Sequence, residues 1–260
     1  MSAYNPSKVV ADAGQAVADI PKGACLAVGG FGLSGIPSVT IKALLEQGAD
    51  DLHVISNNCG VDGKGLGLLL EAGRISRITA SYVGENKEFA RRYLGGELTV
   101  ELTPQGTLAE RLRAGGAGVG AFFTPSGVGT PIQLGGLPWR YDAEGNVVEE
   151  SPRKETREFQ GQEMVLEEGI FADYGIIRAA VADTLGNCRF HAAAQNFNPE
   201  CAMSGRITIV EAERVVEPGE LAPDDIHLPG IFIDRIVQLT EEQAQAKDIE
   251  KRTVRESKEA

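Results

Sequence analysis

Short apolar segments alternate with segments of helical periodicity through the first half of the chain. Residues 24–28 are apolar without a break, which is typical of a strand covered on both faces. The segment after Pro37 has apolar residues at helical spacing and ends at Gly48, since glycine is favoured just beyond a helix terminus. The pattern predicts strands over 24–28, 52–55, 75–83, 97–102 and 119–123, and helices over 6–20, 37–47, 67–71, 85–94 and 108–114.

The order of these elements predicts the fold class. Strands separated by helices pair in parallel through right-handed crossovers. We therefore expect an α/β protein with an open three-layer α/β/α arrangement and a mostly parallel sheet. The pattern breaks after Thr124. Segment 135–159 is polar and rich in turn residues, with the tip of a surface hairpin at 142–146. Further strands are expected over 175–181, 188–191, 207–210 and 231–237.

The chain shows no internal repeat and no clear linker, so we expect a single domain over residues 1–240. The polar segment near 135–159 is then a surface hairpin insertion in that domain. Residues 241–260 are almost all charged or small, and we interpret them as a solvated helix or a frayed end.

Composition narrows the class of protein. The chain has 260 residues and a formal net charge of −12, which disfavours binding along a nucleic-acid backbone. No run of about 18 apolar residues occurs, so no membrane span is expected. The first residues lack the pattern of a secretory signal, and the four cysteines form no C-x-x-C pair. We therefore expect a cytoplasmic protein without nucleic-acid or membrane partners.

The first strand leads into a glycine-rich loop. In a parallel sheet, ligands bind beyond the carboxyl ends of the strands, so the segments that follow each strand matter most. Here these residues are Gly29, Gly30, Phe31, Gly32, Leu33, Ser34 and Gly35. A loop of this kind before a helix exposes N–H groups that bind anions. Its G-x-G-x-x-G spacing also fits dinucleotide binding, but the second strand ends in 56–58 without the acid that holds a ribose. A tightly packed turn is the third interpretation.

Polar amides follow two other strands. Asn57 and Asn58 come after the second strand and are able to donate to a carbonyl or carboxylate, although an Asx-turn is the common role of such residues. Gln105 lies between Pro104 and Gly106 after the strand at 97–102, where its amide is able to donate to a developing oxyanion. A plain surface turn is the alternative. Three such segments at one sheet edge favour a binding site.

The usual catalytic groups are missing. No two of His53, His191 and His227 have the spacing of metal ligands, so we expect no metal site. Cys59 is a candidate nucleophile beside the asparagine pair, but a small packing residue is the commoner role. The chain has neither a G-x-S-x-G nor a Walker A sequence. The pattern indicates part of a site, with an anion loop and donors but without a convincing nucleophile or base.

Several motifs resemble the A (alpha) subunits of the 3-oxoacid coenzyme A transferase family. The resemblance runs from about Lys8 to about Val237 and is specific in each motif. The matching segments are LAVGGFGLSGIP at 26–37, ISNN at 55–58, SYVGEN at 81–86, GTLAER at 106–111, GGAG at 115–118, FTPSGVGT at 123–130 and NFNP at 196–199.

The resemblance implies an activity and a partner. Members of this family move coenzyme A from an acyl-CoA, such as succinyl-CoA, to a 3-oxoacid, such as acetoacetate, in ketone body metabolism. A glutamate attacks the acyl-CoA, and an acyl-enzyme anhydride is followed by a glutamyl-CoA thioester. That glutamate belongs to a Ser-Glu-Asn-Gly motif of the B (beta) subunit, and this chain has no such tetrapeptide. The resemblance thus implies a hetero-oligomer in which coenzyme A is a substrate and no cofactor is tightly bound.

The resemblance also assigns site residues and a fold. It places Asn57, Asn58 and Gln105 in the active site, with Gln105 at the oxyanion, and it makes 29–35 the loop that binds coenzyme A. The implied fold is the open α/β fold shared with certain sugar-phosphate isomerases. The chain departs from the family pattern at Lys22, a turn position, and at Gln195, where arginine is common. A 3-oxoadipate or short-chain fatty acid transferase, a nucleotide-dependent oxidoreductase and a non-catalytic ligand sensor are the alternatives.

Overall fold

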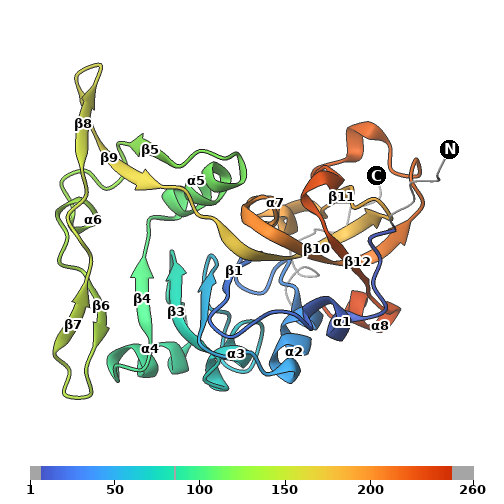
Figure 1. The fold of residues 1–260 in the computed structure, drawn as a ribbon, viewed down its shortest axis with the longest axis horizontal. Helices are drawn as coiled ribbons and strands as arrows, with labels where there is room; N and C mark the ends of the chain where they lie inside the picture. Colours follow the sequence, from blue (N-terminus) through green and yellow to red (C-terminus); the bar gives the residue numbers. More distant parts are fainter. Residues whose placement is uncertain (1–6, 85, 248–260) are drawn as a thin grey trace, which may run out of the picture.

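A parallel sheet forms the centre of the molecule (Figure 1). The structure is a computed structural model and describes residues 7–84 and 86–247. The strand order of the largest sheet is β13-β12-β10-β1-β2-β3-β4, with all neighbours parallel, while β11 pairs antiparallel with β10. The strands are β1 (Cys25–Val28), β2 (Leu52–Ile55), β3 (Ile75–Ala80), β4 (Thr99–Leu102), β10 (Ala172–Asp183), β11 (Cys188–Arg189), β12 (Gly205–Val216) and β13 (Arg235–Gln238). The predicted fold class is confirmed.

Helices cover both faces of this sheet. Because side chains alternate along a strand, Leu26 and Val28 of β1 belong to one core and Ala27 to the other. The first core lies under α1 (Ala13–Val17), α2 (Ser38–Gln47), α3 (Gly67–Glu71) and α4 (Lys87–Leu94). The second lies under α5 (Gln105–Gly116) and α7 (Asn198–Ser204). The strand at 24–28 is therefore buried on both faces, as its unbroken apolar run predicts.

The first predicted helix is too long. The pattern predicts residues 6–20, but α1 covers only Ala13–Val17 and starts after Asp12, whose carboxylate accepts from the Gln15 N–H at 2.8 Å. The preceding segment is extended instead, and Val9 forms a bridge with Ile236 of β13. The apolar residues at the start of the predicted helix therefore pair with the sheet and do not form a helical turn. Pro6 lies outside the described residues, as do Glu85 and residues 248–260 of the predicted tail.

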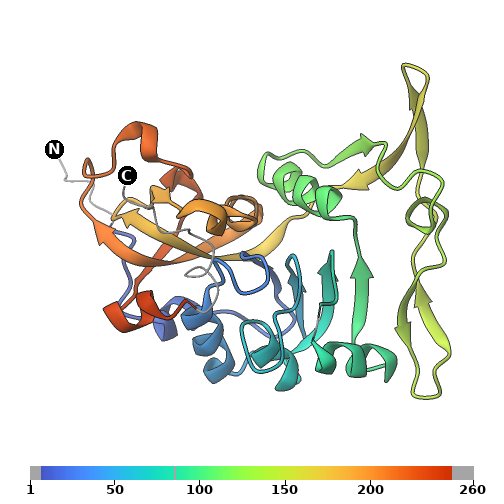
Figure 2. The same cartoon turned by 180° about the vertical axis from the view of Figure 1, so that it is seen from behind.

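The predicted strand at 119–123 is not part of the central sheet. It appears as β5 (Ala121–Thr124), which pairs antiparallel with β9 (Gln162–Glu168) in a separate sheet of order β5-β9-β8. The pairing partner lies some forty residues further on, which local periodicity does not reveal. Between them lie α6 (Pro131–Leu134), the hairpin β6 (Pro138–Tyr141) and β7 (Val147–Glu150), and β8 (Thr156–Phe159). Figure 2 shows the β6–β7 hairpin of this segment beside the edge strand β4.

The end of the described chain packs against the central sheet. A 3-10 turn, Gly230–Phe232, replaces the start of the strand expected over 231–237, so β13 begins at Arg235. The short helix α8 (Glu241–Gln245) follows and starts with a capping box between Thr240 and Gln243. Over residues 7–84 and 86–247, no helix has the length and apolar character required to span a bilayer.

Candidate functional site

The predicted segments meet at one edge of the sheet. Because β1, β2, β3 and β4 are parallel neighbours, their carboxyl ends lie side by side. The 29–35 loop follows β1, Asn57 and Asn58 follow β2, Ser81 follows β3, and Gln105 follows β4. The structure therefore brings the glycine loop and the three amide side chains to the same edge.

The 29–35 loop is a tight turn between β1 and α2. Phe31 and Ser34 exchange two backbone hydrogen bonds of 3.0 Å, and Phe31 is 49% exposed at the tip. Gly30, Gly32 and Gly35 have positive φ angles of 109°, 60° and 65°. Glycine adopts these angles without the strain that a Cβ atom causes. The loop thus presents its backbone and one aromatic ring at the site edge.

The first residue of α7 and the loop before it hold the 29–35 loop in place. The Asn198 side chain is fully buried, and its Nδ2 donates to the Gly35 carbonyl oxygen at 3.1 Å. Its Oδ1 accepts from the Arg178 N–H at 3.0 Å, and the Asn196 Nδ2 donates to the Ser34 carbonyl oxygen at 3.1 Å. Asn198 is thus a positioning residue. It lies in the NFNP motif, but the sequence alone indicates no role for it. Its contact with Gly35 spans more than 160 residues, so no local signal reveals it.

Gln195 lies next to this contact. It ends the 3-10 helix Ala192–Gln195, and its side chain is exposed. The neighbouring Asn196 has a φ angle of 23°, a conformation that is uncommon outside glycine and is often kept at functional loops. Gln195, where the family commonly has arginine, therefore borders the 29–35 loop. Lys22, the other departure from the family pattern, pairs with Asp50 at 3.5 Å on the surface.

Gly29→Ala is expected to destabilise the protein by about 3 kcal/mol, the upper end of the usual cost of overpacking. A Cβ atom at Gly29 would collide with the Asn198 Oδ1, which is fixed by its own hydrogen bonds. Urea unfolding of both proteins at one pH measures the change. Gly106→Ala is the matched control, because a Cβ atom there meets nothing within 4 Å. Equal stabilities for the Gly29 and Gly106 variants would contradict the close approach of Gly29 to Asn198.

The two asparagines after β2 have different environments. Asn57 is 2% exposed, and its Nδ2 donates to the Ser81 Oγ at 2.9 Å, while that hydroxyl donates back to the Asn57 carbonyl oxygen at 3.0 Å. Asn58 is half-buried, and its Oδ1 accepts from the Gly60 N–H at 3.2 Å in the Asx-type turn that the alternative interpretation describes. Among the described residues, the Asn58 Nδ2 has no acceptor. Asn57 is therefore held within the edge, whereas the Asn58 Nδ2 is a donor that no described residue uses.

Gln105 is the first residue of α5, so the helix begins three residues earlier than the pattern predicts. Pro104 precedes it and supplies no side-chain cap. The Gln105 side chain is exposed, and its amide has no hydrogen-bond partner in the described part of the chain. The first N–H groups of α5 are also open, and they carry the positive end of the helix dipole. This arrangement suits a carboxylate or an oxyanion.

The other candidate groups at the sheet are not poised to react. Complete burial of Cys59 raises the pKa of its thiol far above the usual range, so the nucleophilic thiolate is absent near neutral pH. Burial lowers the pKa of His53 to about 4, and its Nε2 lies 3.0 Å from the Thr79 Oγ1. The His227 Nδ1 accepts from the Phe190 N–H at 3.1 Å. In the parts of the chain that the structure describes, no group of three His, Cys, Asp or Glu residues is arranged to hold a metal ion.

A family model for coenzyme A transferases matches residues 10–239. The chain therefore belongs to the coenzyme A transferase family, as the motifs predict. Its relatives include a Mycobacterium tuberculosis protein named as the probable A subunit of succinyl-CoA:3-ketoacid coenzyme A transferase, with 60% identity over 249 residues, which are 96% of this chain and 99% of the relative. The A subunit of the Helicobacter pylori succinyl-CoA:3-ketoacid coenzyme A transferase is 49% identical over 252 residues, 97% of this chain and 100% of the relative.

Solved structures share the fold. The acyl-CoA transferase YdiF of Escherichia coli O157:H7 superimposes with a TM-score of 0.76 at 24% identity, over 92% of this chain and 48% of that enzyme. The chain thus spans about half of YdiF. Glutaconate coenzyme A-transferase of Acidaminococcus fermentans gives a TM-score of 0.75 at 21% identity, over 93% of this chain and 78% of that one. At these identities the likeness concerns the fold alone, while the designation of the relatives as A subunits implies a partner subunit.

Proposed function

We propose that this chain is the A subunit of a succinyl-CoA:3-oxoacid coenzyme A transferase, which moves coenzyme A from succinyl-CoA to a 3-oxoacid such as acetoacetate. The observation that carries the proposal is the identity of 49–60% with subunits of that name over nearly the whole chain. This chain has no Ser-Glu-Asn-Gly tetrapeptide, so we infer that a B subunit of a hetero-oligomer supplies the nucleophile. The acid-free end of β2, where Asn57 bonds to Ser81, disfavours the dinucleotide alternative.

The proposed reaction uses two covalent intermediates on the partner's glutamate. The carboxylate attacks the thioester carbonyl of succinyl-CoA, and the coenzyme A thiolate leaves to give a mixed anhydride. The thiolate then attacks the glutamyl carbonyl, which releases succinate and forms a glutamyl-CoA thioester. Acetoacetate attacks this thioester, and the same two steps in reverse yield acetoacetyl-CoA and the free carboxylate. No proton or external cofactor is consumed.

In this scheme the described chain supplies donors. Gln105 and the open N–H groups of α5 stabilise the oxyanion that forms at the attacked carbonyl. The free Nδ2 of Asn58 orients the carboxylate of the acid substrate, while Asn57 keeps the edge rigid through Ser81. The 29–35 loop contacts coenzyme A with its exposed backbone and Phe31. This proposal implies that the enzyme is cytoplasmic and acts in ketone body metabolism.

A comparison of acceptor acids tests the proposal. The chain is co-expressed with a B subunit that carries the Ser-Glu-Asn-Gly motif, and the purified assembly is given succinyl-CoA with acetoacetate, 3-oxoadipate or butyrate in parallel. Acetoacetate is expected to give the highest kcat/KM, measured from acetoacetyl-CoA absorbance and by chromatography of the acyl-CoA products. A preference for 3-oxoadipate or butyrate would mean that this acid, and not acetoacetate, is the acceptor. Saturable NADH binding without exchange of coenzyme A would favour the oxidoreductase alternative.

A further inference from the structure

Two glycine loops enclose a small pocket on the α2 side of the site edge. The 29–35 loop after β1 contributes Leu33, and the loop after β2 contributes Gly63 and Gly65. These loops are in contact, since a Cβ atom at Gly65 would lie 3.3 Å from the Leu33 Cδ2. The pocket has a volume of about 300 Å³. That volume is at the lower end for a ligand pocket, so it suits a compact group better than a whole nucleotide.

Positive side chains line this pocket. Lys42 of α2, Lys64, Arg178 of β10 and Lys247 contribute to its wall, whereas none of its described lining residues is an aspartate or glutamate. In a chain with a formal charge of −12, a concave surface with this lining is an exception. Charges of one sign around a concave surface concentrate the potential there and attract ions of the opposite sign.

Buried carboxylates hold part of this wall in place. Arg178 is 6% exposed, and its guanidinium donates to Glu211 at 3.3 Å and to Glu213 at 3.1 Å. Lys247 also pairs with Glu213, at 2.7 Å. Both glutamates are outside the pocket lining. Arg178 and Lys247 are therefore held in the wall by ion pairs, and these pairs also balance their charges.

The helix terminus at the pocket is already occupied. Ser38, the first residue of α2, lines the pocket, but the Glu211 Oε2 accepts from the N–H groups of Val39 and Thr40 at 3.0 and 2.8 Å. The cations, and Lys42 above all, must then provide the attraction. Lys42 is exposed and forms no ion pair with any described residue.

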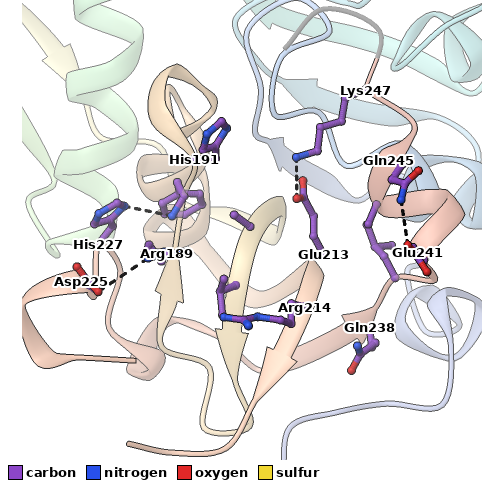
Figure 3. Close-up of a pocket in the computed structure, with 15 residues that line it drawn as sticks. Arg189, His191, Glu213, Arg214, Asp225, His227, Gln238, Glu241, Gln245 and Lys247 are labelled. Atoms are coloured by element: carbon purple, nitrogen blue, oxygen red, sulfur yellow. Dashed lines mark hydrogen bonds and ion pairs between the residues drawn. The ribbon is translucent and has the colours of Figure 1, made fainter. Parts of the chain in front are cut away.

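A second, larger cavity differs from this pocket in its charges. It has a volume of about 1210 Å³ and lies over β10, β12, β13 and α8. Figure 3 shows two ion pairs among its lining residues, Arg189 with Asp225 at 3.9 Å and Lys247 with Glu213 at 2.7 Å. Glu241 adds a further carboxylate to its wall. It therefore lacks the one-sided lining of the smaller pocket.

We propose that the pocket between the glycine loops binds the phosphate groups at the nucleotide end of coenzyme A. This inference rests on the proposed function. The pantetheine arm separates these phosphates from the reacting thiol, so their site must lie apart from Asn58 and Gln105 while remaining next to the 29–35 loop. The 29–35 loop contributes Leu33 to the pocket, whose lining includes neither Asn58 nor Gln105, and Lys42 has the charge and hydrogen-bond donors that phosphate binding requires.

The test compares Lys42→Gln with the wild-type assembly of both subunits. Loss of one charge-assisted contact is expected to raise the KM for succinyl-CoA and the Kd of coenzyme A about tenfold, with kcat and the KM for acetoacetate unchanged. Succinyl-pantetheine, which lacks the nucleotide, is expected to have the same KM with both proteins. Lys87→Gln is the matched control, because Lys87 is an exposed helical lysine outside the pocket.

Two results would overturn the inference. One is an unchanged Kd of coenzyme A in the Lys42 variant, measured by calorimetry. The other is an equal increase in KM for succinyl-CoA and for succinyl-pantetheine, which would mean that the nucleotide end is not what Lys42 contacts. Failure of the proposed function has a different signature, namely a wild-type assembly that does not exchange coenzyme A. Calorimetry still decides the pocket in that case, because it requires no turnover.

Discussion

Purified without its partner, the chain is expected to show no exchange of coenzyme A between succinyl-CoA and acetoacetate. The donors at the sheet edge stabilise charge but form no bond to the acyl group, and the thiol of Cys59 is buried and protonated. Covalent catalysis requires a nucleophile that attacks the thioester carbonyl. Without the partner no such attack takes place, so the donors have no oxyanion to stabilise. Addition of the Ser-Glu-Asn-Gly subunit is expected to restore turnover, measured by formation of acetoacetyl-CoA.

A covalent trap gives the decisive measurement. The assembly is incubated with succinyl-CoA alone, and the two subunits are then separated and weighed by mass spectrometry. The coenzyme A adduct is expected on the partner. An adduct on this chain, or steady turnover by this chain alone, would refute the proposed division of the active site between two subunits.

The Gln105→Ala assembly is expected to have a kcat about 10²–10³-fold lower than the wild type, the usual cost of removing one oxyanion donor. The amide of Gln105 is exposed at the start of α5 and bonds to no described residue, so it is available to the substrate. Since the interaction is made mainly in the transition state, the KM for succinyl-CoA is expected to change little.

Two controls separate this effect from a loss of structure. Gln162→Ala removes an exposed glutamine from β9, outside the site edge, and is expected to leave kcat unchanged. Urea unfolding of Gln105→Ala is expected to match the wild type, because the side chain makes no hydrogen bond within the described chain. An unchanged kcat in Gln105→Ala would reject the oxyanion role, and a large loss of stability would assign the residue to the fold.

Local pattern was sufficient for most of the central sheet. The predicted strand at 52–55 and helix at 67–71 coincide with β2 and α3, because apolar burial and flanking glycines act within a few residues. Elements that depend on distant partners were placed less well. Val9 is extended because it meets Ile236, and β5 leaves the sheet because it pairs with β9. Neither contact has a signature near the residues concerned.

The same distinction holds for the candidate site. The glycine loop and the amides stand out because each follows a strand, and the parallel sheet alone brings them to one edge. Asn198, Lys42 and Arg178 did not stand out, because they reach their places in the site only through tertiary contacts. Arg178 and Lys42 are 136 positions apart, and neither lies in a motif. The roles of Asn57, Asn58 and Gln105 stay predictions until the variants are measured.

The carboxylate that caps α2 has a consequence for biosynthesis. Glu211 accepts from Val39, Thr40 and the Thr40 hydroxyl, and β10 separates its strand from β1. On the ribosome, the early loops emerge long before these later residues are made. The nascent chain therefore has to wait for its last third before the glycine loops acquire their final support, and we expect it to become native only when synthesis is nearly complete.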